Sequence, residues 1–203
     1  MREVLKSRLL QAAAALAVGG AGGMAARAPD PAPSAAVVLA MELGSYFESS
    51  GRHIGRPYVD TLGKGQPLTV CNGVTGPDVI AGRYYSPEDC RRLELPRYRA
   101  AERWAQRAFA HWGVYNDWVR ASLIDMIYNL GPGAVDGSTL LRLANAGDLA
   151  GACAQMPRWV RGTVDGRSVV LPGLVERRDA TRELCAQWGR DGHFSADILE
   201  AQK

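Results

Sequence analysis

The chain has 203 residues, of which 47% are hydrophobic and 22% are charged, and its formal net charge is +3. This length suffices for one domain with a buried core. The mild charge, without a stripe of Lys and Arg, argues against a nucleic-acid partner but permits attraction to an anionic polymer. The four cysteines show no C-x-x-C spacing, so we expect no metal site.

The N-terminus has the pattern of an export segment. Arg2, Lys6 and Arg8 precede the uncharged run Leu9–Ala26, and this order of basic and apolar residues is typical of exported proteins. As a helix the run would reach about 27 Å, barely the roughly 30 Å of a bilayer's hydrocarbon core. Three interpretations stay open, in order of preference: a signal-anchor that is later released from the membrane, a signal peptide cleaved near Ala26–Ala28, and a permanent anchor.

The next segment marks where the folded domain should begin. Residues 28–34 read A-P-D-P-A-P-S, and so many prolines cannot form a helix. We therefore interpret residues 1–27 as a signal-anchor-release or signal segment and residues 28–34 as a linker. A single folded domain is expected over residues 35–190, followed by a C-terminal tail at residues 191–203.

The first half of the domain should begin and end with a helix. Ser34 can cap an apolar helix over Ala35–Phe47. The Gly- and Pro-rich segment Gly51–Pro67 and the run Leu68–Cys71 predict short strands and turns. The capping-box sequence S-P-E-D at residues 86–89 then predicts a long helix toward residue 110.

The second half is predicted to be mostly helical. Asn116 should cap a helix that Gly131-Pro132-Gly133 stops, and Ser138 and Asp148 should each start a short helix. The Asp165-Gly166 pair, between β-branched residues, predicts a hairpin, and a last helix should run from residue 173 to 188. The predicted class is α+β, a mostly helical lobe with a small β subdomain near its N-terminal end.

Glu48, Asp60 and Thr69 form the most informative pattern. Glu48 follows the apolar helix, Asp60 lies in the Gly- and Pro-rich segment, and Thr69 lies in the β-like run. Cleavage of a glycosidic bond uses two carboxyl groups, one to protonate the leaving oxygen and one to support a water or stabilise charge on the sugar. Taken singly, each residue also has an ordinary role, at a helix end, in a turn or in a strand.

Several ordered stretches carry a resemblance that covers roughly residues 34–188. They are P-Y-V-D (57–60), T-V-C-N-G-V-T-G (69–76), Y-N-L-G-P-G-A (128–134), S-T-L-L-R (138–142), N-A-G-D-L-A-G-A-C (145–153), P-R-W-V (157–160) and L-P-G-L-V-E-R-R-D-A-T-R-E-L-C (171–185). Through them the chain resembles the phage-type lysozymes, or endolysins, of glycoside hydrolase family 24. It is most similar to the lambdoid branch with signal-anchor-release N-termini, and the resemblance implies a lysozyme-like fold.

The resemblance also implies catalytic roles. Glu48 matches the family's general acid, Asp60 its second carboxylate, and Thr69 the residue that positions the attacking water. The chain departs from the family by two short insertions, near residues 52–56 and 64–67, which lengthen the turns on either side of Asp60. Val74 stands where the family often has His.

Further residues are candidates for binding and for stability. Asn129 and Arg177 are candidate substrate contacts, although a helix C-terminal cap and a solvated helix face are equally open interpretations. Arg177 and Arg178 are expected to face different sides of the last helix. We prefer disulfides Cys71–Cys90 and Cys153–Cys185, with buried free thiols as the alternative.

The implied function is that of an endolysin which hydrolyses the β-1,4 bond between N-acetylmuramic acid and N-acetylglucosamine in peptidoglycan, with inversion, and so lyses the host cell. No cofactor is expected, and the protein should be a monomer. Its partners would be peptidoglycan and, through the N-terminal segment before release, the inner membrane. It would be tethered there and then periplasmic, or periplasmic after signal cleavage.

Two other functions remain open. A lytic transglycosylase shares a lysozyme-like lobe but needs one acid only, because the sugar's own hydroxyl attacks. A non-catalytic wall-binding or immunity-type protein would keep the fold without the chemistry. The presence of Glu48 together with Asp60 and Thr69 disfavours both.

Overall fold

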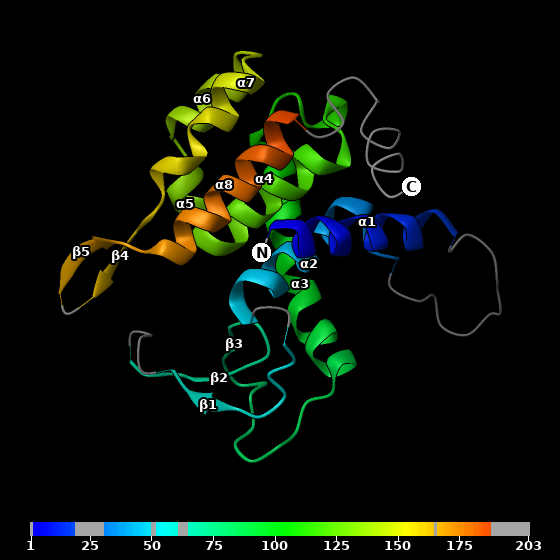
Figure 1. Ribbon diagram of the computed structural model, residues 1–203, viewed down its shortest axis with the longest axis vertical. Coiled ribbons are helices and arrows are strands. Elements are labelled where there is room, and N and C mark those ends of the chain that lie inside the picture. Colours follow the sequence, from blue (N-terminus) through cyan, green and yellow to red (C-terminus); the bar gives the residue numbers. More distant parts are fainter. Residues whose placement is uncertain (1, 19–30, 50–51, 61–64, 165, 188–203) are drawn as a thin grey trace. The chain divides into compact units, whose positions relative to one another are not determined.

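The computed structural model describes residues 2–18, 31–49, 52–60, 65–164 and 166–187 (Figure 1). The chain divides into two compact units, which we call unit 1 (Glu3–Ala100) and unit 2 (from Ala101 onward). The boundary falls inside helix α3 (Pro87–Ala108). The predicted tail at residues 191–203 and residues 28–30 of the predicted linker lie outside the described residues.

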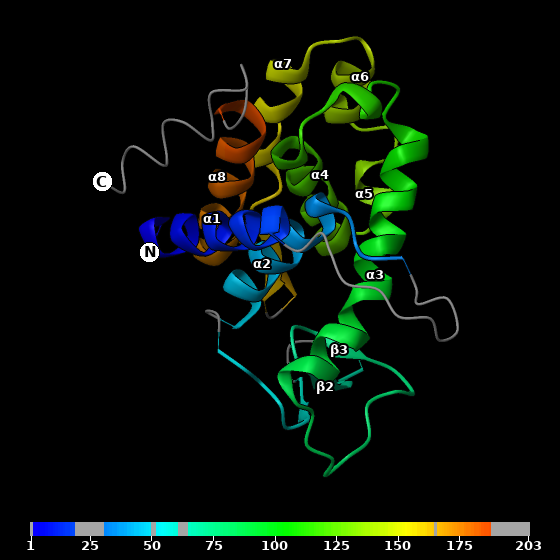
Figure 2. The ribbon, with the colours of Figure 1, turned by 90° about the vertical axis from the view of Figure 1, so that its right-hand side faces the viewer.

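Unit 1 begins with two helices, α1 (Arg2–Val18) and α2 (Ala35–Ser49). They lie side by side in Figure 2, and Arg8 of α1 forms an ion pair with Glu42 of α2 at 3.2 Å. In the described part of the chain, no helix combines the length and the apolar character that crossing a membrane requires. Residues 19–30, which include much of the predicted export run, lie outside that part.

A small antiparallel sheet completes unit 1. Its strands are β1 (Tyr58–Val59), β2 (Leu68–Val70) and β3 (Val74–Thr75), with β2 in the middle. One face of the sheet packs into a small apolar cluster formed by Val70, Cys71, Val74, Val79, Tyr85 and Cys90. The Cys71–Cys90 disulfide ties the end of β2 to the first turn of α3, as preferred from the sequence.

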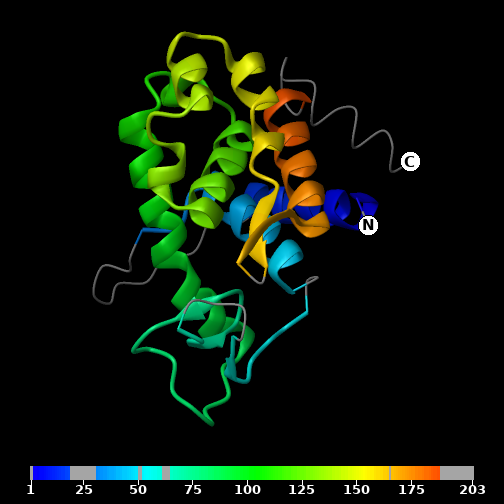
Figure 3. The ribbon, with the colours of Figure 1, turned by 90° about the vertical axis from the view of Figure 1, so that its left-hand side faces the viewer.

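Unit 2 is mainly helical. Its elements are η1 (Trp112–Val114), α4 (Asp117–Leu130), α5 (Pro132–Val135), α6 (Thr139–Asn145), α7 (Leu149–Ala154), η2 (Met156–Arg158), β4 (Arg161–Val164), β5 (Arg167–Val170) and α8 (Pro172–Gln187). The β4–β5 hairpin leads directly into α8 (Figure 3). Helix α4 packs mainly against α8, and the Cys153–Cys185 disulfide joins α7 to α8. The predicted α+β class, mostly helical with a small β subdomain near the N-terminal end, is confirmed.

The predicted helix caps are present. The Asn116 side chain accepts from the backbone N–H groups of Trp118 and Val119 at the start of α4. The Ser34 hydroxyl accepts from the N–H of Val37 at 3.1 Å. These local contacts explain why the sequence located the helix starts well.

The Gly131-Pro132-Gly133 segment behaves differently from the prediction. It ends α4, as expected, but the short helix α5 starts at once from Pro132. Proline is favoured at the first position of a helix because its φ angle is already helical and no N–H partner is needed there. The same residues therefore stop one helix and start the next.

Candidate active site

The three predicted catalytic residues all belong to unit 1. Glu48 lies in the last turn of α2 and is exposed. Asp60 follows β1 directly and is half-buried, whereas Thr69 lies in the central strand β2 with only 1% of its surface exposed. The position of Glu48 at the helix end leaves its side chain accessible to solvent.

The sheet brings Asp60 and Thr69 together at one carbonyl group. The backbone N–H of Asp60 donates to the carbonyl oxygen of Pro67 at 3.0 Å. The hydroxyl of Thr69 donates to the same oxygen at 3.1 Å. This shared acceptor fixes the start of the Asp60 turn relative to the Thr69 side chain, although the insertion that begins near residue 64 separates them in sequence.

Tyr58 is a neighbour of the predicted residues that the sequence analysis did not single out. It pairs with Thr69 across β1 and β2. Partial burial raises the pKa of the Tyr58 phenol, and the negative charges of Asp60 and Glu48 raise this pKa further. Glu48 and Asp60 therefore both lie close enough to the Tyr58 phenol to influence its pKa. The two carboxylates thus share one neighbouring side chain. The P-Y-V-D sequence could have indicated Tyr58, because Tyr58 and Asp60 are two residues apart and residues two apart on a strand share a face.

The carboxylate of Glu94 supports the turn after β2. Glu94 of α3 is buried, and its Oε1 accepts from the backbone N–H of Asn72 at 3.1 Å and from its side-chain amide at 3.0 Å. Burial raises the pKa of the Glu94 carboxyl, and it outweighs the opposing effects of Asn72, Arg91 and Arg97. Glu94 thus holds the β2–β3 turn, which continues the strand that carries Thr69.

The same region contains a cavity of about 210 Å³, lined among others by His53, Asn72 and Glu94. None of the three predicted catalytic residues lines it. The sulfurs of Cys71 and Cys90 and the carboxylate of Glu94 cluster here, but metal binding needs thiolates and these sulfurs are bonded to each other. The cluster therefore has no thiolate to offer a metal ion.

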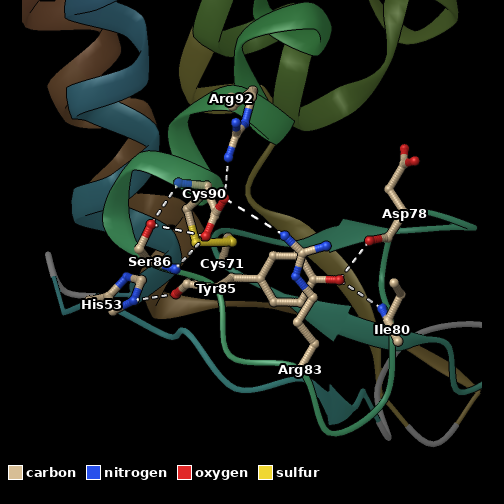
Figure 4. A network of polar contacts seen from close by, with 10 residues as sticks. His53, Cys71, Asp78, Ile80, Arg83, Tyr85, Ser86, Cys90 and Arg92 are labelled. Atoms are coloured by element: carbon tan, nitrogen blue, oxygen red, sulfur yellow. Dashed lines mark hydrogen bonds and ion pairs between the residues drawn. A yellow bond between two sulfur atoms is a disulfide. The ribbon is translucent and has the colours of Figure 1, made fainter.

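A polar network fixes the loop that leads into α3 (Figure 4). The hydroxyl of Tyr85 donates to the carbonyl oxygen of Asp78 at 2.6 Å and accepts from the N–H of Ile80 at 2.8 Å. One ring nitrogen of His53 lies 2.7 Å from the carbonyl oxygen of Tyr85. These bonds link the segment before β1 to the loop between β3 and α3.

In unit 2, Arg177 is placed differently from the prediction. Its guanidinium donates two hydrogen bonds to the carboxylate of Asp125, at 3.1 and 2.7 Å, and only 3% of the residue is exposed. A side chain in this position cannot touch a polysaccharide without leaving its partner. Arg177 therefore does not lie on a solvated helix face, and its ion pair joins α8 to α4.

Arg178 is buried as well, so both arginines of α8 lie in the interior of unit 2. Arg178 donates to the side-chain oxygen of Asn129 and to the sulfur of Met126, and one of its nitrogens lies 3.8 Å from Asp125. Asn129 is half-buried, and Gly131 rather than Asn129 caps the end of α4. The side-chain oxygen of Asn129 is therefore held by Arg178.

The family model for phage lysozyme matches residues 52–181. The chain belongs to the phage lysozyme family. Asp60 and Thr69 fall inside the matched range, and Glu48 falls just before it.

Curated relatives agree with the family. The chain is 35% identical over 134 residues to the SAR-endolysin of Enterobacteria phage P21, which covers 66% of this chain and 75% of the relative. It is 39% identical over 138 residues to the SAR-endolysin of Escherichia phage Mu, covering 66% and 73%. The family consists of glycoside hydrolases that degrade peptidoglycan, so this phage lysozyme is a peptidoglycan-hydrolysing enzyme.

Solved structures show the same fold. The endolysin from Escherichia coli O157:H7 phage FAHEc1 superimposes with a TM-score of 0.64 at 22% identity, covering 73% of this chain and 90% of that one. The active form of the P1 phage endolysin Lyz gives 0.59 at 21% identity, covering 75% and 83%. At such identities the likeness concerns the fold alone.

Proposed function

We propose that this phage lysozyme is an endolysin that cleaves the β-1,4 bond between N-acetylmuramic acid and N-acetylglucosamine in peptidoglycan and thereby lyses the host cell. The observation that carries the proposal is the shared Pro67 carbonyl, which ties Asp60 to Thr69. The common electrostatic influence of Glu48 and Asp60 on Tyr58 supports it. Acid, base and water-binding hydroxyl are thus available in one unit.

In the proposed reaction, Glu48 gives its proton to the glycosidic oxygen, and the bond between that oxygen and the anomeric carbon breaks. The exposed position of Glu48 lets it reach a polymer, and bound sugars would then exclude water from it. Positive charge develops on the sugar as the bond breaks. Asp60 stays ionised and takes one proton from the attacking water as the general base.

The hydrogen bond of Thr69 defines its part in this step. A hydroxyl has one hydrogen and two lone pairs, and the hydrogen of Thr69 is directed at Pro67. Its lone pairs then accept a hydrogen bond from the water. A water that donates one hydrogen to Asp60 and the other to Thr69 turns its own lone pair toward the anomeric carbon.

This arrangement implies inversion, because the water attacks directly from the face opposite the leaving oxygen. Proton NMR of a soluble glycan during digestion distinguishes the outcomes. The α-anomer should appear first and then mutarotate. Initial release of the β-anomer would instead indicate retention and would remove Asp60 from the role of general base.

The bond specificity is tested by mass spectrometry of muropeptides from purified peptidoglycan digested by the full chain. Muropeptides with reducing N-acetylmuramic acid ends should form, and they should be absent with Glu48→Gln but present with Glu88→Gln, a control at an exposed position of the same unit. Products with 1,6-anhydro ends would make the protein a lytic transglycosylase. If neither the native protein nor the control releases products, the result would favour the non-catalytic wall-binding alternative.

The other proposed properties follow the relatives. Export with release from the inner membrane, or with signal cleavage, is supported by the SAR-endolysin relatives. The mass of the periplasmic protein separates the two routes, since cleavage would leave a chain that starts near residue 28. In unit 2, the amide nitrogen of Asn129 remains our proposed donor to a sugar, with its oxygen held by Arg178. We further propose that the enzyme acts as a monomer without a cofactor.

A further inference from the structure

We propose that Tyr58 contacts the polysaccharide at the bond that is cleaved, with its ring as a wall against one sugar and its hydroxyl as a hydrogen-bond donor to a sugar oxygen. The inference rests on the proposed function, because it takes Glu48 and Asp60 as the groups that flank this bond. It adds a substrate-binding residue to the reaction.

The position of Tyr58 in the sheet is the first argument. Tyr58 lies directly opposite Thr69 in the antiparallel pair of β1 and β2. Residues directly opposite each other project to the same face of a sheet, and so do residues two apart along a strand. The bond from the Asp60 N–H to Pro67 extends this pairing by one residue. Tyr58, Asp60 and Thr69 therefore share one face.

The accessibility of the side chain is the second argument. Tyr58 has 43% of its surface exposed, although it lies among residues that the mechanism uses. Its hydroxyl makes no hydrogen bond with any residue that the structure describes. A tyrosine of this kind offers an apolar ring and a polar tip to a ligand that has both kinds of surface, and a pyranose ring has both.

The electrostatic surroundings are the third argument. Partial burial raises the pKa of the Tyr58 phenol above the ordinary value of 10.0, and the charges of Asp60 and Glu48 raise this pKa further. The hydroxyl therefore keeps its hydrogen throughout the pH range in which a wall hydrolase works. It can donate to a neutral sugar oxygen between two carboxyl groups that are occupied with proton transfer.

Tyr84 provides a matched control in the same unit. It is also exposed, at 57%, but its ring packs edge-on against His53 with 5.8 Å between the centroids. The two tyrosines thus have similar exposure and different neighbours. The Tyr84 variants therefore show how the loss of an exposed ring affects the fold where no contact with substrate is proposed.

The test compares Tyr58→Phe, Tyr58→Ala, Tyr84→Phe and Tyr84→Ala in the full chain, with kcat and KM measured on solubilised peptidoglycan and Tm measured for each. Tyr58→Phe should lower kcat/KM about 3- to 10-fold, the effect of one hydrogen bond. Tyr58→Ala should lower it about 10- to 100-fold, because the contact of the ring with the sugar is lost as well. Tm should stay unchanged in all four, and both Tyr84 variants should keep native kinetics.

The outcomes separate this inference from the proposed function. Native kinetics in both Tyr58 variants, with an inactive Glu48→Gln, would overturn the role of Tyr58 and leave the function intact. A Tyr58→Ala loss that is accompanied by a lower Tm, and that Tyr58→Phe fails to restore in part, would assign Tyr58 to the fold and also overturn it. An active Glu48→Gln would contradict the proposed function itself.

Discussion

The carboxylates proposed to be catalytic in unit 1 and the carboxylate of Asp125 in unit 2 have opposite surroundings. In unit 1, Glu48 is exposed and Asp60 is half-buried, so both are accessible to a polymer. In unit 2, Asp125 is completely buried and is held by Arg177, with Arg178 close by. The same chemical group thus serves reactivity where solvent reaches it and cohesion where it is enclosed with its counter-charges.

This difference has an energetic basis. A carboxylate enclosed in a protein needs a charged partner and well-formed hydrogen bonds, and removal of one partner leaves the other buried and uncompensated. An accessible carboxylate pays no such desolvation penalty and can change partners when substrate binds. Substitution of Glu48 or Asp60 should therefore affect turnover, whereas substitution of Asp125 should affect stability.

The largest effect on stability is expected for Asp125→Ala. The free energy of unfolding should fall by about 3–5 kcal/mol, because two buried arginines lose their counter-charge. Urea denaturation measures this fall. Asp125→Asn, which keeps the shape and one acceptor, should show a smaller loss if the alanine variant fails to fold.

Asp136→Ala is the matched control, since Asp136 is exposed in the same unit. It should change the free energy of unfolding by less than about 0.5 kcal/mol. A loss at Asp125 no larger than at Asp136 would contradict the cohesive role of the buried pair.

Loss of a disulfide should have the next largest effect on stability. The effect of this loss on turnover should differ between the two units. Loops of 19 and 32 residues are closed by Cys71–Cys90 and Cys153–Cys185, and the chain-entropy model gives each about 3–4 kcal/mol. Replacing either pair with serine should cost about this much in urea denaturation.

Activity measured well below the unfolding midpoint then distinguishes the two disulfides. The Cys71→Ser, Cys90→Ser variant should lose turnover, because the disulfide lies two residues from Thr69, whereas the Cys153→Ser, Cys185→Ser variant should keep it. Equal turnover in the two double variants would show that the disulfide of unit 1 does not position the site.

A smaller effect concerns the pH dependence of stability. Since the pKa of Glu94 is raised in the folded chain above its ordinary value of 4.5, the folded state binds this proton more tightly than the unfolded state. Its contribution to the free energy of unfolding must then fall as the pH rises from about 4.5 through the raised pKa. Glu94→Gln keeps an acceptor for Asn72 and removes the titration.

Urea denaturation from pH 4 to 8 should show the Glu94→Gln variant gaining stability relative to the native chain as the pH rises. Glu88→Gln, at an exposed position of the same helix, should follow the native profile. Parallel profiles for Glu94→Gln and the native chain would contradict the role assigned to burial.

The sequence predicted those features that local chemistry determines. The caps at Ser34 and Asn116 and the β4–β5 hairpin depend on residues a few positions apart, so their pattern is visible in the chain itself. The presence of short strands and turns near Asp60 and Thr69 followed from Gly, Pro and β-branched residues. The preferred pairing of the cysteines is also confirmed by the structure.

The features that the sequence did not reveal depend on distant contacts. Neither interpretation of Arg177 included its ion pair with Asp125, because Asp125 is 52 residues away in the sequence. The exposure of Glu48 depends on how α2 ends in the folded unit. Tyr58 became a candidate only when the register placed it opposite Thr69, because a tyrosine in a strand has no special meaning by itself.

The most direct measurement of the central claim is the turnover of peptidoglycan by Glu48→Gln, with its Tm measured on the same preparation. Loss of a general acid typically costs about 10²- to 10⁴-fold in rate, and an exposed side chain should contribute little to stability. We therefore predict a loss of this size with an unchanged Tm. Native turnover in the folded variant would contradict the assignment of Glu48 as the catalytic acid.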